Sequence, residues 1–369
     1  MGIPEKIKAI QDEMAKTQIN KATEHHIGLL KAKIAKLKRE QEENIIKKSG
    51  MKSDGFDVRR SGDATVVFIG LPSVGKSTLL NKMTKAKSVV GAFTFTTLTV
   101  VPGMMEYRGA KIQVLDLPGI IKGASTGKGL GKRILSVART ADLVLLMLDV
   151  FQPYHENVLV NELGNIGIRL NQLPPNITIE KASMGGIAVA QQVKLTKITE
   201  KHLKDILHLY GIVSARVVIR EDVTSEQLAD YIAGNISYSK SITIVNKVDL
   251  VDKKFLKELK KKIKSEVIEV SANSDINIEL LKEKIYEKLK FIRIYMRPKG
   301  GETDFKEPLI AREGDTVEDI CNKLHRRMKR AFRFGLVWGK SVKFGGQRVG
   351  LTHILLDEDV LTIIKKRGA

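Results

Sequence analysis

The sequence predicts a doubly wound α/β domain with a mostly parallel sheet, accompanied by smaller helical and mixed α+β parts. Short apolar runs recur along the chain, and helical stretches separate most of them, which is the pattern of buried parallel strands. The chain has 369 residues, enough for two or three domains. Its 43% hydrophobic and 28% charged residues are typical of globular proteins and argue against disordered or collagen-like chains. The expected strands are Ala64–Ile69, Ile112–Leu115, Leu143–Val150, Ile242–Val245 and, more weakly, Val267–Val270.

Residues 1–60 are expected to form a helical hairpin followed by a linker. Apolar residues recur at a helical period in two runs, and Gly28 with the polar stretch before it indicates two helices rather than one rod. Basic residues from Lys31 to Arg39 line the second helix. A solvated face and a phosphate-binding face explain this stripe equally well.

The interval from Val150 to Ile242 is too long for one crossover helix. A helix over His155–Leu170 supplies the crossover, and Pro174-Pro175 then breaks the chain. The stretch that follows reads as a hairpin, a helix over Glu200–Tyr210 and a strand over Ala215–Ile219. We therefore expect a small α+β insertion at residues 172–222, which divides the main domain into residues 61–171 and 223–290.

Residues 291–369 are expected to form a separate small domain with a mixed sheet and one main helix. Ile292–Met296 is strand-like, and Thr316-x-x-Asp319 resembles a capping box that opens a helix through Met328. Three further strands are expected at Gly335–Trp338, Val349–Ile354 and Val360–Ile364.

The strongest motif is a phosphate-binding loop of the form G-x-x-x-x-G-K-[ST]. It lies between an apolar strand and a helix that continues from Thr78, which is the context that the motif needs. Its glycines let backbone amides converge on phosphate oxygens. Lys76 should reach the β- and γ-phosphates, and Ser77 should ligate Mg²⁺. The loop comprises Gly70, Leu71, Pro72, Ser73, Val74, Gly75, Lys76 and Ser77.

A second motif, N-K-x-D at residues 246–249, selects the base. The Asp249 carboxylate can accept hydrogen bonds from both guanine donors, whereas adenine would leave it unpaired. Asn246 can tie this loop to the phosphate loop, and the stem of Lys247 can pack on the base. A third loop, Ser271-Ala272-Asn273, is expected to bring a backbone N–H near guanine O6.

Two further loops are expected to bind the metal and contact the γ-phosphate. Asp116-Leu117-Pro118-Gly119 follows a strand, so that Asp116 should reach Mg²⁺ through water and the Gly119 amide should sense the γ-phosphate beside Lys76. In the loop containing Phe95, Thr96 and Thr97, we assign Thr97 as the second hydroxyl ligand of Mg²⁺, with Thr96 as its rival.

These motifs together resemble those of the developmentally regulated GTP-binding protein (DRG) family, within the Obg-like translation GTPases. The matching segments are GLPSVGKS (70–77), FTFTTLTVVPG (93–103), DLPGIIKGA (116–124), NKVD (246–249), SAN (271–273), GIRLNQLPP (167–175), RIYMRPKG (293–300) and GLTHILLDEDVLTI (350–363). The resemblance implies a P-loop GTPase domain, an N-terminal helical hairpin, an insertion like the second domain of ribosomal protein S5, and a C-terminal β-grasp TGS domain. It also implies association with ribosomes and, in eukaryotic relatives, a stabilising zinc-finger partner.

The expected activity is hydrolysis of GTP to GDP and phosphate, at a slow intrinsic rate. Ile120 stands where Ras-like enzymes place a Gln that orients water, so the charge must come from K⁺, a partner or a dimer. Several such families hold K⁺ with an Asn at the position of Ser73, and this departure weakens the case for K⁺. No general base can be named. A GTP-gated RNA- or protein-binding scaffold is the alternative function; N-K-x-D argues against an ATPase.

The charge balance predicts a polyanionic partner. Lys and Arg number 63 against 42 Asp and Glu, for a net charge of +21. The densest basic cluster places four residues on one face of an expected helix, proposed to contact RNA phosphates: Arg326, Lys329, Arg330 and Arg333. Aromatic residues make up only 5%, which disfavours a surface built mainly on base stacking. A single cysteine and the lack of an apolar run of about 18 residues favour a cytoplasmic location without membrane contact. We also expect a monomer.

Overall fold

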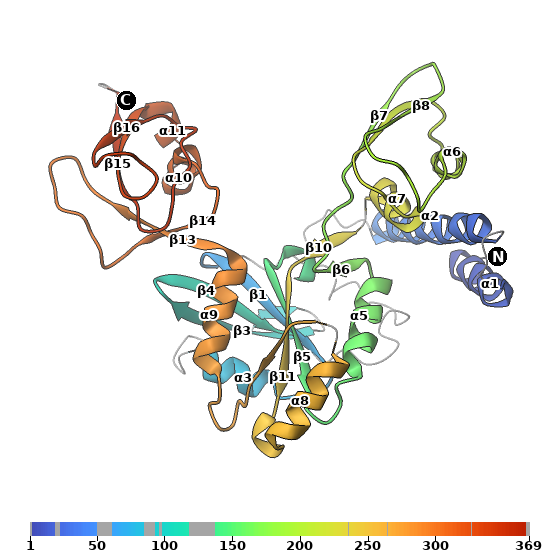
Figure 1. Cartoon of the computed structure of the whole chain (residues 1–369), viewed down its shortest axis with the longest axis horizontal. Coiled ribbons are helices and arrows are strands. Elements are labelled where there is room, and N and C mark those ends of the chain that lie inside the picture. Colours follow the sequence, from blue (N-terminus) through green and yellow to red (C-terminus); the bar gives the residue numbers. More distant parts are fainter. Residues whose placement is uncertain are drawn as a thin grey trace. The chain divides into compact units, whose positions relative to one another are not determined.

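The computed structural model describes residues 2–18, 23–49, 61–84, 93–95, 98–117, 137–234, 236–263, 265–325 and 327–366. These residues form two compact units (Figure 1). The first unit joins residues 1–57 to residues 163–238, and the second joins residues 58–162 to residues 239–369. Within the described residues, no helix is both long and apolar enough to cross a membrane.

The second unit contains the predicted α/β domain, which is built on a seven-stranded sheet. The strand order is β12-β11-β5-β1-β4-β3-β2. The first five of these strands run parallel, and β3 and β2 are antiparallel additions at one edge. The strands are β1 (Ala64–Gly70), β2 (Phe93–Phe95), β3 (Leu98–Tyr107), β4 (Ala110–Asp116), β5 (Leu143–Asp149), β11 (Ser241–Asn246) and β12 (Val267–Glu269). The prediction of a mostly parallel sheet is confirmed.

Helices complete this domain. The apolar faces of α3 (Lys76–Met83) and α9 (Ile278–Leu289) join the core formed by the central strands, where Phe68 and Leu145 are fully buried. The other elements are α5 (His155–Asn165), the short 3₁₀ turn η1 (Val248–Leu250) and α8 (Lys253–Lys262). Because the parallel strands end at one edge of the sheet, the loops that follow β1, β4, β5 and β11 share that edge.

The first unit contains the inserted domain, whose sheet differs from the expected hairpin. The strands β7 (Ile177–Lys181) and β8 (Ile187–Gln191) do not pair with each other, because β9 (Ala215–Ile219) lies between them. β9 is antiparallel to β7 and parallel to β8. Its three inward residues are all buried, so the most buried strand occupies the centre of the sheet.

The N-terminal hairpin and the insertion share one hydrophobic core. Helix α1 (Ile3–Lys16) is followed by α2 (Glu24–Ser49), whose fully buried Ala32 clusters with residues of α6 (Glu200–Leu209) and α7 (Ser225–Ala233). The Tyr210 hydroxyl donates a hydrogen bond to the Ala32 carbonyl at 3.1 Å. A Cβ at Gly28 would lie 2.4 Å from the His202 ring, so only glycine permits this approach.

Three residues of the basic stripe on α2 are bonded to the insertion. Lys36 Nζ donates to the carbonyl of Leu209 at 2.8 Å, and Arg39 donates to that of Ile232 at 3.4 Å. Lys31 pairs with Glu226 at 2.5 Å. This part of the stripe therefore serves an interface within the chain, whereas Lys33 on the same helix is exposed.

The boundaries of the insertion are wider than expected. Helix α7, predicted as part of the main domain, buries Leu228 and Ala229 in the core of the insertion. The expected crossover helix ends at Asn165, and residues 168–170 form β6, which pairs with β10 (Ser237–Ser239). The chain therefore enters and leaves the insertion along neighbouring strands, and the compact unit spans residues 163–238 rather than 172–222.

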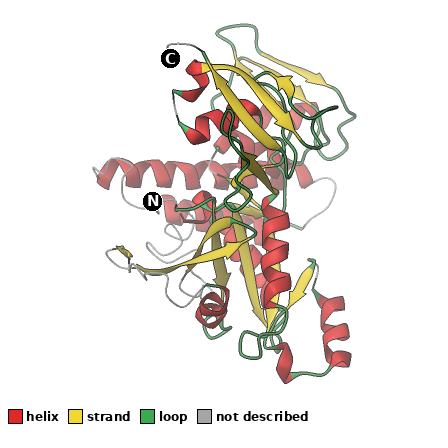
Figure 2. Cartoon of the chain, turned by 90° about the vertical axis from the view of Figure 1, so that its left-hand side faces the viewer, coloured by secondary structure: helices red, strands yellow, loops and turns green. Residues whose placement is uncertain are grey.

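The C-terminal domain has a mixed five-stranded sheet in the order β14-β13-β17-β15-β16. Figure 2 shows its curved strands near the C terminus, with helical turns on one side. The capping box at Thr316 is present and opens α10. The elements are β13 (Phe291–Met296), β14 (Leu309–Arg312), α10 (Val317–Leu324), α11 (Met328–Ala331), β15 (Phe332–Trp338), β16 (Gln347–Val349) and β17 (Val360–Lys365).

The prediction that four basic residues share one helix face and contact RNA from it is wrong. The main helix ends at Leu324 rather than Met328, because His325 adopts an extended conformation. Lys329 and Arg330 lie on the short helix α11. Arg333 lies on strand β15, whose residues Phe332 and Val337 are buried in the core of this domain. Arg326 lies outside the described residues. The four basic residues therefore share no helix face.

Candidate nucleotide-binding site

The phosphate loop has the predicted position and a backbone that requires glycine. It leaves fully buried β1 and enters α3 at Lys76. Gly75 has φ +94°, and a Cβ there would lie 2.4 Å from the Asn246 amide nitrogen. Ser73 also adopts the left-handed region, with φ +64°. A backbone so curled turns successive amides toward one point, as anion-binding loops do.

Lys76 lies under this loop as a buried cation. Its Nζ donates to the carbonyl of Leu71 at 3.0 Å and more weakly to that of Gly70 at 3.3 Å. Burial lowers the pKa of the Lys76 ammonium, and the charge of Asp116 opposes that shift. Phosphate oxygens would compensate this charge better than carbonyl oxygens do.

Ser77, in the first turn of α3, meets Asp116, which ends β4, and the pair fits a magnesium site. The Ser77 hydroxyl donates to Asp116 Oδ2, and Asp116 is 9% exposed. The other carboxylate oxygen, Oδ1, is buried and has no hydrogen-bond partner among the described residues. The Ser77 hydroxyl and the Asp116 carboxylate, with its unsatisfied oxygen, are hard oxygen donors of the kind that Mg²⁺ prefers.

Asn246 links the phosphate loop to the base-reading loop, as predicted. It ends β11, where its side chain is buried. Its Nδ2 donates to the carbonyl of Val74 at 2.8 Å, and its Oδ1 accepts from the amide of Ala272 at 3.1 Å. The Ala272 amide is therefore already used within the site, while Asn273, the last residue of this loop, is exposed.

Asp249 is exposed and prepared to accept hydrogen bonds. It lies in η1, next to the loop that begins at Ser271. Hydrogen bonds from the hydroxyls of Ser271 and Ser274 lower the pKa of the Asp249 carboxyl, with the larger effect from Ser271. The carboxylate is thus ionised in the form that pairs with two guanine donors.

Asp149, which the sequence analysis did not single out, holds Lys247. Lys247 Nζ lies 2.6 Å from Asp149 Oδ2, and Lys247 has φ +67°. Asp149 ends β5 and is opposite Asn246 in the register of β5 and β11. Its second oxygen accepts from the amide of Phe151 at 3.0 Å. The sequence does show an acid at the end of an apolar strand, which could have drawn attention to Asp149. Its pairing with Lys247, however, follows only from the order of the strands in the sheet.

Some of the remaining predicted residues lie within the part of the chain that the structure describes, and others lie outside it. Leu117 is buried directly after β4, while Pro72 and Thr78 are exposed at the phosphate loop. Phe95 ends strand β2. Thr96, Thr97, Pro118, Gly119 and Ile120 lie outside the described residues.

A phosphate loop after β1, a buried acid at the end of β4 and an N-K-x-D loop after β11 define a P-loop GTP-binding protein. The family described as "50S ribosome-binding GTPase" matches residues 65–181, and the C-terminal region of that domain matches residues 184–291. The TGS domain matches residues 292–365.

Full-length relatives share this organisation. An uncharacterized GTP-binding protein of Methanocaldococcus jannaschii is 55% identical, over 100% of this chain and 94% of that protein. Developmentally-regulated GTP-binding protein 2 is 45% identical in Homo sapiens, and its homolog in Dictyostelium discoideum is 49% identical, each over 99% of this chain and 100% of the relative. A solved FeoB G-domain from Methanococcus jannaschii aligns with a TM-score of 0.33 and 20% identity, over 62% of this chain and 97% of that chain. The chain belongs to the developmentally regulated GTP-binding protein family.

Proposed function

We propose that this chain is a slow GTPase switch that works on ribosomes. The observation that carries the proposal is the pair of Asn246 hydrogen bonds, because they couple the phosphate loop to the loop that reads the base. A guanine nucleotide would then bind as a unit, with its base and its phosphates held by one connected network.

In the proposed reaction, water attacks the γ-phosphorus, the bond to the β–γ bridging oxygen breaks, and GDP leaves with inorganic phosphate as the second product. Lys76 and the Gly119 amide stabilise charge on the phosphate oxygens. Ser77 and Thr97 would hold Mg²⁺ directly and Asp116 would hold it through water, and the ion would supply positive charge to the phosphate groups. Intrinsic turnover should stay far below ~1 s⁻¹ because Ile120 cannot position water. Ribosomes, a partner protein, a dimer or K⁺ would supply the missing charge.

Ribosome association is supported by the net charge of +21 and by the match to the 50S ribosome-binding GTPase family. We propose that Arg326, Lys329, Arg330 and Arg333 still contribute to RNA binding, with Lys329 and Arg330 on the short helix α11 and Arg333 on β15. Lys329 pairs with Glu318, so it should contribute less than its neighbours. We further propose a cytoplasmic monomer, stabilised by a zinc-finger partner if the source is eukaryotic.

The second candidate is a GTP-gated scaffold in which turnover is unimportant, and Ile120 is the residue that favours it. Co-sedimentation with ribosomes in the GDP, GTP-analogue and nucleotide-free states tests both candidates. The switch predicts nucleotide-dependent binding and ribosome-stimulated hydrolysis, and the scaffold predicts the first without the second. Equal binding in all three states would contradict both. Asp249→Asn, which should lose the guanine nucleotide, is the control for gating.

A further inference from the structure

The C-terminal domain contains a long stretch without acidic residues. From Asn322 to Leu356 the sequence has no Asp or Glu. Four aromatic residues stand among the basic ones: Phe332, Phe334, Trp338 and Phe344. The stretch has nine basic side chains: Lys323, Arg326, Arg327, Lys329, Arg330, Arg333, Lys340, Lys343 and Arg348. Positive charge and rings are therefore concentrated here in a chain that is only 5% aromatic.

The fold places part of this stretch on the sheet face opposite α10. Alternate residues of β15, such as Val337, enter the core beneath the helix, and so Phe334 and Trp338 lie on the other face. Arg348 of β16 is opposite Leu336 and reaches diagonally over Phe334, with its guanidinium carbon 4.0 Å from the ring centroid. Arg333 lies 5.8 Å from the same centroid. Guanidinium groups thus lie against a half-buried ring.

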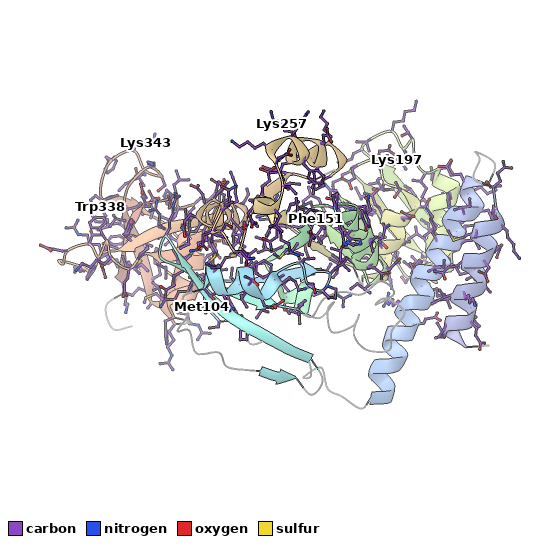
Figure 3. The ribbon with its side chains drawn as sticks, turned by 90° about the horizontal axis from the view of Figure 1, so that it is seen from below. Met104, Phe151, Lys197, Lys257, Trp338 and Lys343 are labelled. Carbon is purple, nitrogen blue, oxygen red and sulfur yellow. The ribbon has the colours of Figure 1, made fainter. Side chains whose placement is uncertain are left out.

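Trp338 organises the loop that joins β15 to β16. The Arg297 guanidinium carbon lies 5.0 Å from its ring centroid. Against the indole lies the backbone of Gly345, where a Cβ would come within 2.7 Å of the ring. Figure 3 shows Trp338 and Lys343 together in this domain. The tip of the loop presents Phe344, which is 65% exposed, beside exposed Lys343.

Several cations of this surface form no ion pair within the described part of the chain, although Lys340 is close enough to Asp357 to help lower the pKa of that carboxyl. In the described part of the protein, five of them form no ion pair: Arg330, Arg333, Lys340, Lys343 and Arg348. Arg293, on strand β13 of the same sheet, behaves differently, because Asp357 and Glu358 each bind it at 2.8 Å. The contrast separates a structural arginine from arginines that are available to a polyanion.

We propose that strands β15 and β16 and the loop between them, here the β15–β16 surface, bind single-stranded RNA. Unpaired bases stack on Phe344 and on the Arg348 guanidinium above Phe334, and phosphates contact Arg333, Lys340 and Lys343. A duplex hides its bases, so it would engage the cations alone. This inference rests on the proposed RNA association. It adds the surface that binds the RNA and the contacts that select single strands.

The chain carries its own reporter, because Trp338 is its one tryptophan. Titration of the full-length protein with a 12-nucleotide oligouridine RNA should change Trp338 fluorescence. Anisotropy of the labelled RNA should give a dissociation constant that Phe344→Ala combined with Arg348→Gln raises at least about tenfold. Both side chains are exposed, and circular dichroism will verify that the fold is kept.

The matched control is Phe255→Ala with Lys257→Gln, an exposed aromatic and an exposed cation on α8. It should leave RNA binding unchanged. The proposal would be overturned if the Phe344/Arg348 variant bound oligouridine as tightly as the unaltered protein does. It would also be overturned if duplex RNA bound as tightly as oligouridine and lost as much affinity in this variant. Binding to phosphatidylserine vesicles without binding to RNA would also overturn it. If ribosome co-sedimentation persists when oligouridine binding is absent, this inference fails alone; if both are absent, the proposed function fails with it.

Discussion

The nucleotide site and the hairpin–insertion interface use polar groups in opposite ways. At the nucleotide site, Asp116 has a buried oxygen with no partner among the described residues, and the buried Lys76 ammonium is bonded only to backbone carbonyls there. At the interface, Lys36 and Lys31 are satisfied by a carbonyl and an acid of the insertion. The unpartnered Asp116 oxygen lies among the nucleotide-binding motifs, whereas the paired lysines hold the hairpin to the insertion. His202 Nε2, which is also buried without a partner among the described residues, shows that a missing partner does not by itself mark a ligand site. A run of positive charge is thus interpretable only once its partners are known.

The largest effect should follow from Asp249→Asn at the nucleotide site. The amide would present a donor to guanine donors, so affinity for GDP and GTP should fall at least about a hundredfold, while xanthosine diphosphate gains affinity. Fluorescent nucleotide titration measures both. Asp252→Asn, three residues on, is the control because Asn caps α8 as well as Asp does. Unchanged GDP affinity in Asp249→Asn would show that the base pocket is misassigned.

A smaller loss should follow from Asp149→Asn, because Lys247 would lose the carboxylate that positions it. We expect about a tenfold faster release of GDP. In a double-mutant cycle with Lys247→Met, the two effects should not add, since Asp149 acts through Lys247. Asp142→Asn, at the other end of β5, should change thermal stability without changing nucleotide release, because Asp142 accepts from the Thr65 amide. Strict additivity in the cycle would mean that Asp149 acts independently of Lys247.

At the interface, Lys36→Met should destabilise the first unit by about 1.5–3 kcal/mol, the usual range for a hydrogen bond to a charged group. Lys33→Met on the exposed face of the same helix should be nearly neutral. Urea unfolding measures both variants, and GDP affinity should not change in either. If the two lysines prove equally dispensable, then the interface does not depend on this bond.

The smallest effect is a pH dependence of the interface. Burial, helped by the nearby His25, lowers the pKa of His202 to about 4, although Asp205 opposes the shift. Unfolded His202 binds a proton near its ordinary value of 6.5, so stability from this group is complete above pH 6.5 and declines toward pH 4. Thermal unfolding followed between pH 7.5 and 5 should show this decline. His202→Leu should flatten it, and an unaltered slope would assign the decline to other groups.

The phosphate loop and N-K-x-D were predictable because each motif combines local backbone needs with one chemical role. Gly75 must be glycine, and Asn246 must span two loops, whatever the surrounding fold. Asp149 was not predictable in the same way, because its contact with Lys247 depends on β5 and β11 being neighbours in the sheet.

Other errors arose where distant segments decided local structure. The β7–β8 stretch reads as a hairpin until β9 separates the two strands. The basic run after Leu324 has helical spacing, but Phe332 and Val337 are needed in the sheet core and draw the chain into β15. The stripe on α2 left two interpretations open, because its bonding partners lie about 170 residues further along the chain.

The shared core of the hairpin and the insertion also has a consequence for synthesis. The contact between Tyr210 and Ala32 spans 178 residues. At roughly 5–20 residues per second, α2 would wait about 9–36 s before α6 has been translated. Much of the nucleotide-binding domain is made in that interval, while the apolar side of α2 has no insertion to cover it. The first unit should therefore be the slower one to mature on the nascent chain, and the one most in need of a chaperone.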